Sequence, residues 1–342
     1  MAGSVPERGA GSVPERGPRV RIGVLGAARI APKAVIAPAR ASPEAEIVAV
    51  AARDRSRAQA FADKHGIAHV HTDYAALLAD DEIDAVYNPL PNGLHGEWTI
   101  AALEAGKHVL CEKPFTADAT EAQAVADAAT RAGRVVMEAF HYRYHPLFAR
   151  VLELVGTLGA IHDISARMIA ILPNRHDVRY QLDLAGGATM DVGCYAIHQI
   201  RSVAAAEPGV VSAQAKELTS GIDRAMGATF SFADGCTATM ECALLETRAP
   251  IADLKVTGEQ GRVHVQFPTR PELAWINARS GGTTRRERVK GRPTFWYQLQ
   301  AFCGAVLRDE PTLTGPADAV ATMRVIDAVY EASGLGPRQP SR

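Results

Sequence analysis

From Val20 onward the sequence alternates short apolar segments, rich in β-branched residues, with segments of helical pattern. Alternation of this kind predicts a parallel sheet with helices on both faces and right-handed crossovers. The expected strands are 20–25, 46–52, 85–88, 108–111 and 134–138, and the expected helices end at Ala39 or cover 55–65, 74–78, 96–105 and 119–132. This half of the chain is therefore predicted to be a dinucleotide-type domain.

Beyond Pro146 the pattern changes to two helices, 148–155 and 188–205, followed by strands. Gly and Asp turn signals separate these strands, as in an antiparallel meander. The expected strands are 210–216, 227–232, 236–244, 252–257 and 262–267, and helices at 294–307 and 317–333 close the chain. The predicted fold is α/β: a Rossmann doubly wound parallel sheet, then an α+β domain with a large, mostly antiparallel open sheet.

The same pattern predicts how the chain is divided. The parts are a disordered tail at 1–19, a Rossmann domain at 20–140, an α+β substrate and oligomerisation domain at 141–293, C-terminal helices packing back on the first domain at 294–333, and a tail at 334–342. The first tail repeats GSVPERG at 3–9 and 11–17, and such polar residues cannot bury a core. An open sheet that exposes an apolar face predicts a homodimer or homotetramer formed through that face.

Length and composition favour a two-domain globular protein that acts on a small molecule. The 342 residues exceed what one core usually serves. A content of 47% hydrophobic and 22% charged residues, with a net charge of -1, leaves no basic excess for nucleic acid. No apolar run approaches a membrane span, and the start of the chain lacks a secretory signal. Five cysteines without metal-site spacing fit a reducing cytoplasm.

The turn after the first strand has the composition of a phosphate-binding loop. Gly26-Ala27-Ala28-Arg29-Ile30-Ala31 matches the G-x-G-x-x-G/A pattern except at its middle glycine. Gly26 permits a tight turn, Ala28 is small enough for a pyrophosphate to approach, and the helix that follows offers its amide groups. Arg29 and Ile30 complete the expected cofactor contacts of this loop. A small-residue turn in another kind of βαβ protein is the alternative.

The end of the second strand indicates which dinucleotide is bound. NAD enzymes place a carboxylate there to hold the ribose 2′-hydroxyl, whereas Arg suits a 2′-phosphate. Here the strand ends at Ala52, followed by Arg53 and, one helical turn later, Arg57. The sequence therefore favours NADP over NAD. NAD stays possible, because a strand that ended slightly later would bring Asp54 to the key position.

Lys113 follows a strand of the predicted parallel sheet, at the edge where such sheets bind ligands. A lysine there could be a solvated loop cation. Burial beside a nicotinamide cation would instead lower its pKa toward the range of a proton-transfer group. In the helix after Gly186-Gly187, spacings of four and three place Asp191, Tyr195 and His198 on one face. The alternative for that helix is a structural Asp, Tyr and His.

Together these motifs resemble the Gfo/Idh/MocA oxidoreductase family. The resemblance rests on the small-residue turn, VYNPLPNGLH at 86–95, Glu112-Lys113-Pro114, MEAFHYRYHP at 137–146 and Gly186-Gly187 with Asp191 and Tyr195. It covers nearly everything from Val20 to Ser333. The chain is most similar to the branch of dimeric dihydrodiol dehydrogenase, glucose-fructose oxidoreductase, D-xylose dehydrogenases and deoxysugar 3-ketoreductases. Tyr195 departs from the inositol dehydrogenase branch, which has histidine there, so inositol is the less favoured substrate.

The resemblance implies roles for individual residues. Lys113 would touch the nicotinamide ribose and the substrate, Tyr195 would exchange a proton with the reacting oxygen, and Asp191 would orient the substrate. Glu112 would hold the cofactor, and the nicotinamide side would be lined by Pro89, Leu90, Asn92 and His95. We assign Tyr142, Arg143, Asp191 and His198 to the substrate.

The expected reaction is hydride transfer between nicotinamide and a sugar or cyclic-diol hydroxyl or ketone, with Lys113 and Tyr195 at the reacting oxygen. No metal is expected, because His141 and His145 lack a carboxylate partner at a clear spacing. The substrate alternatives are an aldose or deoxysugar and a trans-dihydrodiol. A third reading is a non-catalytic NADP-binding regulator, which the joint presence of Lys113 and Tyr195 disfavours.

Overall fold

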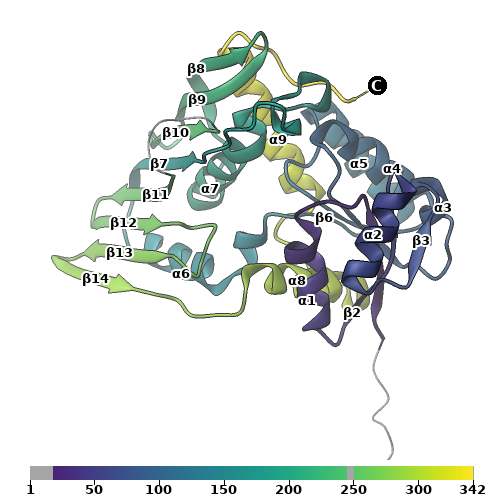
Figure 1. The fold of residues 1–342 in the computed structure, drawn as a ribbon. Coiled ribbons are helices and arrows are strands. Elements are labelled where there is room, and N and C mark those ends of the chain that lie inside the picture. The colour runs from purple at the N-terminus through teal and green to yellow at the C-terminus, as the bar shows by residue number, and fades with distance from the viewer. Residues whose placement is uncertain (1–17, 245–249, 342) are drawn as a thin grey trace, which may run out of the picture.

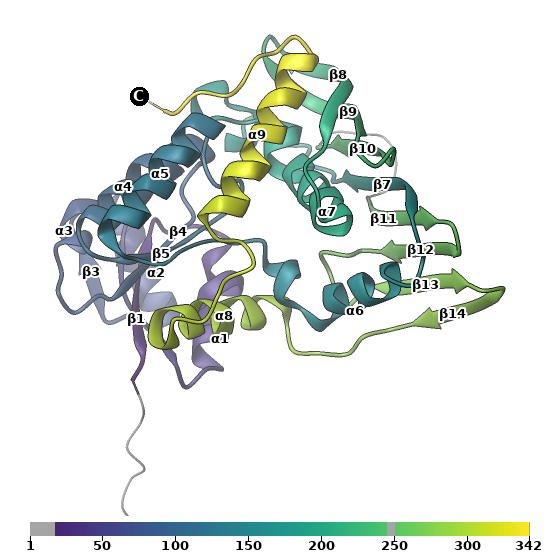
Figure 2. The same cartoon turned by 180° about the vertical axis from the view of Figure 1, so that it is seen from behind.

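The computed structural model describes residues 18–244 and 250–341. It contains a six-stranded and an eight-stranded sheet, joined side by side through α9 and the loops between them (Figures 1 and 2). Residues 1–17, which hold both copies of the repeated segment, lie outside the described residues, so the prediction of a disordered tail is not addressed there. No helix in the described ranges is long and apolar enough to cross a membrane.

The first sheet is parallel throughout, in the order β3-β2-β1-β4-β5-β6. Its strands are β1 (Val20–Leu25), β2 (Ala45–Ala51), β3 (His69–His71), β4 (Ala85–Asn88), β5 (His108–Cys111) and β6 (Val136–Glu138). Its helices are α1 (Ala37–Arg40), α2 (Arg55–His65), α3 (Tyr74–Leu78), α4 (His95–Glu104) and α5 (Ala119–Ala132). The Rossmann prediction is confirmed. The short edge strand β3 was not expected.

The second sheet has the order β14-β13-β12-β11-β7-β10-β9-β8. Its strands are β7 (Ile161–Ile169), β8 (Gly209–Thr219), β9 (Ile222–Ser231), β10 (Thr237–Ala243), β11 (Ile251–Gly258), β12 (Gly261–Gln266), β13 (Trp275–Ser280) and β14 (Thr283–Glu287). All neighbours are antiparallel except β7 and β10, which run parallel at the centre. The open, mostly antiparallel sheet is confirmed, but β7, β13 and β14 were not predicted.

Two helices pack on one face of this sheet. The first is α6 (Pro146–Val155), which contacts β12, and the second is α7 (Cys194–Ala204), which contacts β7 and β10. The strand residues facing α7 are apolar, in rows such as Ala166, Met240 and Leu254. These rows form the main core of the second domain.

The opposite face of the sheet is polar, although an exposed apolar face was the reason for predicting an oligomer. One row across the central strands consists of Arg167, Glu241 and Asp253, in which Arg167 donates to Asp253. The next row, two residues earlier on β7, is equally polar. The expectation of an exposed apolar face was wrong, because the outward positions of these strands carry ion-paired and hydroxyl side chains. The oligomeric state therefore stays a prediction without that support.

Two helices return to the first domain at the end of the chain. Helix α8 (Thr294–Arg308) packs on α1, and α9 (Pro316–Ala332) packs on α5 and also on α7 and β8. The segment after α9 was expected to be a tail but is docked as far as Ser341. Arg338 is 2% exposed and pairs with the buried Asp223, and the amide of Ser341 donates to Gly93. The ion pair with a residue far away in the sequence explains why a polar segment is ordered here.

Candidate active site

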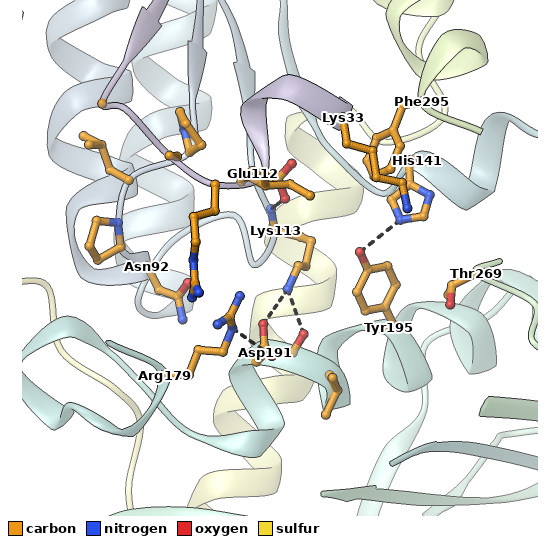
Figure 3. A pocket seen from close by; sticks show the side chains of 18 of the residues that line it. Lys33, Asn92, Glu112, Lys113, His141, Arg179, Asp191, Tyr195, Thr269 and Phe295 are labelled. Atoms are coloured by element: carbon orange, nitrogen blue, oxygen red, sulfur yellow. Dashed lines mark hydrogen bonds and ion pairs between the residues drawn. The ribbon is translucent and has the colours of Figure 1, made fainter. Parts of the chain in front are cut away.

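A cleft of about 1750 Å³ lies between the two domains, at the carboxyl ends of β1, β2, β4 and β5 (Figure 3). This is the edge at which open α/β sheets bind ligands. Residues predicted from the sequence to bind cofactor or substrate line it together: Gly26, Ala28, Arg29, Ile30, Arg53, Arg57, Pro89, Leu90, Asn92, His95, Glu112, Lys113, Asp191 and Tyr195. They come from both domains, so the cleft can hold a cofactor and a substrate side by side.

The glycine turn has the backbone that a phosphate loop needs. Gly26 has φ +92°, and its amide donates to Ala51 at 2.7 Å. A Cβ at Gly26 would lie 3.2 Å from Cδ2 of Leu90 and would be strained at this φ. The helix that follows begins as a π-helical turn, η1 (Pro32–Ile36), rather than the regular helix expected up to Ala39. The loop therefore offers a close backbone approach at this end of the cleft.

The end of β2 carries two arginines and one carboxylate that caps a helix. The strand ends at Ala51, and Ala52, Arg53, Asp54 and Arg57 line the cleft. The Asp54 carboxylate caps α2, because its Oδ1 accepts from the amide of Ser56 at 2.8 Å and from that of Arg57 at 3.3 Å. The hydrogen bond from the Ser56 hydroxyl, together with those from the two amides, lowers the pKa of Asp54. The residue that could have favoured NAD is thus occupied as a helix cap.

Buried polar contacts hold the loops that follow β4 and β5. The Tyr87 hydroxyl donates to Oε1 of Glu112 at 2.7 Å, and burial raises the pKa of Glu112. The ring nitrogens of His95 lie 2.7 Å from the carbonyl oxygens of Leu90 and Pro114. Asn92 donates to the carbonyl of Ala185 in the other domain at 3.0 Å. His95 and Asn92 therefore hold the backbone of the loops around the cleft in place, because both side chains contact main-chain carbonyl oxygens.

Lys113 is ion-paired across the domains. Its Nζ donates to the carboxylate of Asp191 at 2.9 Å and to the main-chain oxygen of Asp191 at 2.8 Å. Burial lowers the pKa of Lys113, but the combined effect of Asp191, Cys194 and Glu112 outweighs burial, and the pKa is raised. The expected lowering of this pKa refers to Lys113 beside a bound nicotinamide cation and stays a prediction.

Arg179 extends this charged contact. Its Nε lies 3.1 Å from Oδ2 of Asp191, and its Nη1 donates to Asp177 at 2.9 Å. Asp177 also pairs with Arg29 of the glycine turn at 3.1 Å. No role is predicted from the sequence for Arg179 or for Asp177. Their roles depend on contacts between segments that no local pattern reports.

Tyr195 lies beside Lys113 in the same cleft (Figure 3). Nζ of Lys113 is 5.2 Å from the centroid of the Tyr195 ring, within the range of a cation–π contact. The Tyr195 hydroxyl lies 3.3 Å from Nε2 of His141. Burial raises the pKa of Tyr195 well above its usual value. His141 was considered from the sequence only as a metal ligand, so this contact was missed.

Three residues assigned to the substrate do not line the cleft. Tyr142 is fully buried, and its hydroxyl lies 2.5 Å from Nδ1 of His198. His198 in turn contacts Asp318 of α9 at 2.9 Å. The guanidinium of Arg143 lies over the ring of Phe148. These residues form the packing behind the cleft rather than its wall.

His198 lies one turn further along the same helix than Tyr195. Residues Thr189–Gly193 form a π-helical turn, η6, and the α-helix begins only at Cys194. Tyr195 and His198 both lie in the α-helix and both contact Phe140, so their spacing of three places them on one face as predicted. Tyr195 lines the cleft, whereas His198 is 1% exposed and stacks on Phe140 with ring centroids 4.2 Å apart.

Comparison with known protein families shows to which family the chain belongs. The description "Oxidoreductase family, NAD-binding Rossmann fold" matches residues 20–140, and "GFO/IDH/MocA C-terminal domain" matches residues 148–264. The chain belongs to the Gfo/Idh/MocA oxidoreductase family. This oxidoreductase is 38% identical to D-xylose 1-dehydrogenase (NADP(+)) 2 of Haloferax volcanii over 92% of its own length and 97% of that protein.

Two further relatives show the range of this Gfo/Idh/MocA branch. The chain is 31% identical to scyllo-inositol 2-dehydrogenase (NADP(+)) IolU of Bacillus subtilis over 75% of its length and 79% of that protein. It also superposes on the crystal structure of KijD10, a 3-ketoreductase from Actinomadura kijaniata in complex with NADP and TDP-benzene. That comparison has a TM-score of 0.85 and 29% identity and covers 92% of this oxidoreductase and 98% of KijD10.

Proposed function

We propose that this oxidoreductase uses NADP and transfers a hydride between nicotinamide and a hydroxyl-bearing or ketone carbon of a sugar. The observation that carries the proposal is the position of Lys113 and Tyr195, which lie against each other in a cleft that the glycine turn also lines. The relatives named as NADP-dependent sugar and inositol dehydrogenases support it.

The residues present fit a dinucleotide phosphate. The turn at Gly26 would take the pyrophosphate, Arg53 and Arg57 would take the 2′-phosphate, and Lys113 and Glu112 would lie at the nicotinamide end. The bound nicotinamide would supply or accept the hydride. The Asp54 carboxylate also lines this part of the cleft, but its Oδ1 is engaged as the cap of α2, and the two cations Arg53 and Arg57 outnumber it.

The protein's own contribution is proton transfer and charge stabilisation. When a carbonyl is reduced, its oxygen becomes anionic, and Tyr195 can give it a proton while the Lys113 ammonium stabilises the oxygen and the phenolate. Oxidation follows the same path in reverse. Asp191 keeps Lys113 protonated and in place, because it accepts two hydrogen bonds from the ammonium group.

A sugar linked to a nucleoside diphosphate is the second candidate substrate. Arg270, Arg288, Lys290 and Arg292 line the cleft with only Glu272 as an acidic neighbour in those two segments. Such a set of cations favours phosphate groups. KijD10, which binds TDP-benzene, supports this candidate. The trans-dihydrodiol substrate and the non-catalytic regulator have no comparable support in the cleft.

The test is NADPH consumption, or NADP⁺ reduction, against free aldoses, nucleotide-linked ketosugars, inositols and cyclic trans-diols, with NADH and NAD⁺ in parallel. Tyr195→Phe should lower turnover by roughly 10²- to 10⁴-fold, the usual contribution of a proton-transfer group. NADPH binding, followed by fluorescence, should be unchanged. Tyr297→Phe, outside the cleft lining, is the matched control. Full turnover by Tyr195→Phe would exclude Tyr195 as the proton donor.

We also propose a cytoplasmic homodimer or homotetramer. All five cysteines are buried free thiols, which fits a reducing compartment. The polar face of the eight-stranded sheet, opposite α6 and α7, is the proposed contact surface. Sedimentation equilibrium of the wild type and of Arg167→Glu, which replaces the ion pair of Arg167 and Asp253 by two neighbouring carboxylates, tests this contact.

A further inference from the structure

The Tyr195 hydroxyl contacts His141, and the proposed function does not explain this contact. Its Nε2 lies 3.3 Å from the hydroxyl oxygen, and the residue is 8% exposed. The ring is fixed on its other side, because Nδ1 lies 3.3 Å from Oγ1 of Thr294. It also packs against the Phe295 ring with centroids 4.2 Å apart.

The hydrogen-bond directions around Thr294 define the tautomer of His141. The single hydroxyl proton of Thr294 is donated to the main-chain oxygen of His141 at 3.0 Å, and a carbonyl can only accept. Oγ1 of Thr294 must therefore accept from the other side, so Nδ1 of His141 carries the ring proton. Nε2 then has a free lone pair, and the Tyr195 hydroxyl is the donor toward it.

The surroundings of His141 keep its ring neutral. Burial and the positive charges of Lys33 and Lys113, with a smaller effect of His145, lower the pKa of His141 to about 3. Lys33 reaches this site from η1, and its Nζ lies 5.5 Å from the centroid of Phe295. A neutral imidazole can accept a proton at Nε2 and release one at Nδ1, and its low basicity prevents it from retaining both.

We propose that His141 relays the proton between Tyr195 and Thr294, an inference that rests on the proposed hydride transfer. In the oxidation, the substrate O–H bond breaks and its proton forms a new bond to the Tyr195 oxygen. The original Tyr195 O–H bond breaks, and that proton bonds to Nε2 of His141. Nδ1 then gives its proton to Oγ1 of Thr294, and the hydroxyl proton that Thr294 directed at the main-chain oxygen of His141 leaves that contact and passes to solvent in the cleft, which Thr294 lines. The hydride takes the electron pair of the C–H bond to the nicotinamide, and reduction reverses each step.

The first experiment needs no cofactor and no substrate. Protein with ¹⁵N-labelled histidine is examined by long-range ¹H–¹⁵N NMR, and His141→Gln identifies the signal. We expect a neutral Nδ1–H tautomer at neutral pH, and in Tyr195→Phe a shift of the Nε2 resonance toward that of an unbonded lone pair. An Nε2–H tautomer, or an Nε2 signal that does not respond to Tyr195→Phe, would overturn the relay. This outcome is independent of whether hydride transfer occurs.

The second experiment separates proton transfer from positioning. In His141→Gln the amide oxygen can still accept from the Tyr195 hydroxyl but cannot pass a proton on, whereas His141→Leu removes both abilities. We expect single-turnover rates to fall by roughly 10- to 100-fold in both variants, with little change in KM. The dependence of the rate on the D₂O fraction should be curved in the wild type and linear in His141→Gln. His162→Gln, at an exposed position on β7, is the control exchange.

A His141→Gln rate equal to that of the wild type would show that His141 only orients Tyr195 and would overturn the proposal. An unchanged D₂O dependence in His141→Gln would do the same. If no substrate gave hydride transfer with the wild type, the proposed function would fail, and the NMR result would still decide whether His141 receives the Tyr195 proton.

Discussion

Nζ of Lys113 donates to two oxygens of Asp191, the main-chain oxygen at 2.8 Å and the carboxylate Oδ1 at 2.9 Å. Lys113 follows β5 of the first domain, and Asp191 lies in η6 of the second. This contact thus fixes the position of Lys113 and joins the two domains in the cleft. It also sets the charge of the lysine, because the carboxylate raises the pKa that burial would lower.

Asp191→Asn should move the alkaline limb of the pH profile to lower pH. Without the carboxylate, burial and the nearby Arg179 cation both lower the pKa of Lys113, so the lysine loses its proton earlier as the pH rises. We expect kcat/KM at neutral pH to fall by at least about tenfold. The measurement is kcat/KM against pH, with the exposed Asp63→Asn as control. An alkaline limb at the same pH in both variants would contradict the assignment.

Arg53→Ala should weaken NADPH binding and leave NADH binding nearly unchanged. The guanidinium is expected to contact the 2′-phosphate, and a hydrogen bond to a charged group contributes about 1.5 to 3 kcal/mol, which is roughly a 10- to 100-fold change in Kd. Fluorescence titration with both cofactors measures the effect. Arg55→Ala is a close control, since Arg55 is exposed two residues later but does not line the cleft. Equal losses for both cofactors would place the 2′-phosphate elsewhere.

The first domain was predictable because its signals are local. Helices α2, α3 and α5 have the expected bounds, and each is capped by an aspartate, namely Asp54, Asp73 and Asp118. In the second sheet, the missed strand β14 has no such local signal. Strand β14 is an edge strand made wholly of polar residues, so it has no apolar pattern to detect.

The position of the site could be predicted from the sequence, but the contacts between its side chains could not. Lys113 could be placed because parallel strands bring their carboxyl ends to one edge. The ion pair of Lys113 with Asp191, and the contact of Tyr195 with His141, depend on how two domains meet. His198 shares a helix face with Tyr195 but is covered by other side chains, among them Phe140 and Tyr142. The residues that cover one turn of a helix come from distant segments, so a single sequence does not report them.

Asp327→Asn should stabilise the protein above neutral pH. Burial, with the negative charges of Asp118 and Glu331, raises the pKa of Asp327 to about 7. A raised pKa means that the folded state holds this proton more tightly than the unfolded state, so its contribution is complete below pH 4 and is lost as the pH rises through about 7. Asn keeps an acceptor for the amide of Ala119, which Asp327 binds at 2.8 Å, without the charge.

Urea denaturation of the wild type and Asp327→Asn at about pH 5 and about pH 8.5 measures this effect. We expect no difference at the lower pH and a gain on the order of 1 kcal/mol at the higher pH, reduced by the partial exposure of the group. Asp127→Asn, on the exposed face of α5, should show no gain in stability at either pH. Equal gains at both pH values would mean that the titration of Asp327 is not their cause.

Arg338→Met should destabilise the protein and also lower its activity. Arg338 donates to the buried Asp223 at 2.7 Å and to the carbonyl of Gly186 at 2.8 Å. Asp223 in turn accepts from the amide and the hydroxyl of Thr189, the first residue of the π turn that carries Asp191. Removing the guanidinium leaves a buried carboxylate uncompensated, which costs about 3 kcal/mol or more. It also releases the turn that positions Asp191 against Lys113.

The free energy of unfolding and the pH profile of kcat/KM should therefore change together in Arg338→Met. The alkaline limb should move in the same direction as in Asp191→Asn, because a displaced Asp191 no longer holds the pKa of Lys113 up. Arg131→Met, at an exposed position on α5, controls for the loss of one surface-type cation. A less stable Arg338→Met protein with the wild-type pH profile would show that the C-terminal segment stabilises the fold without positioning the site.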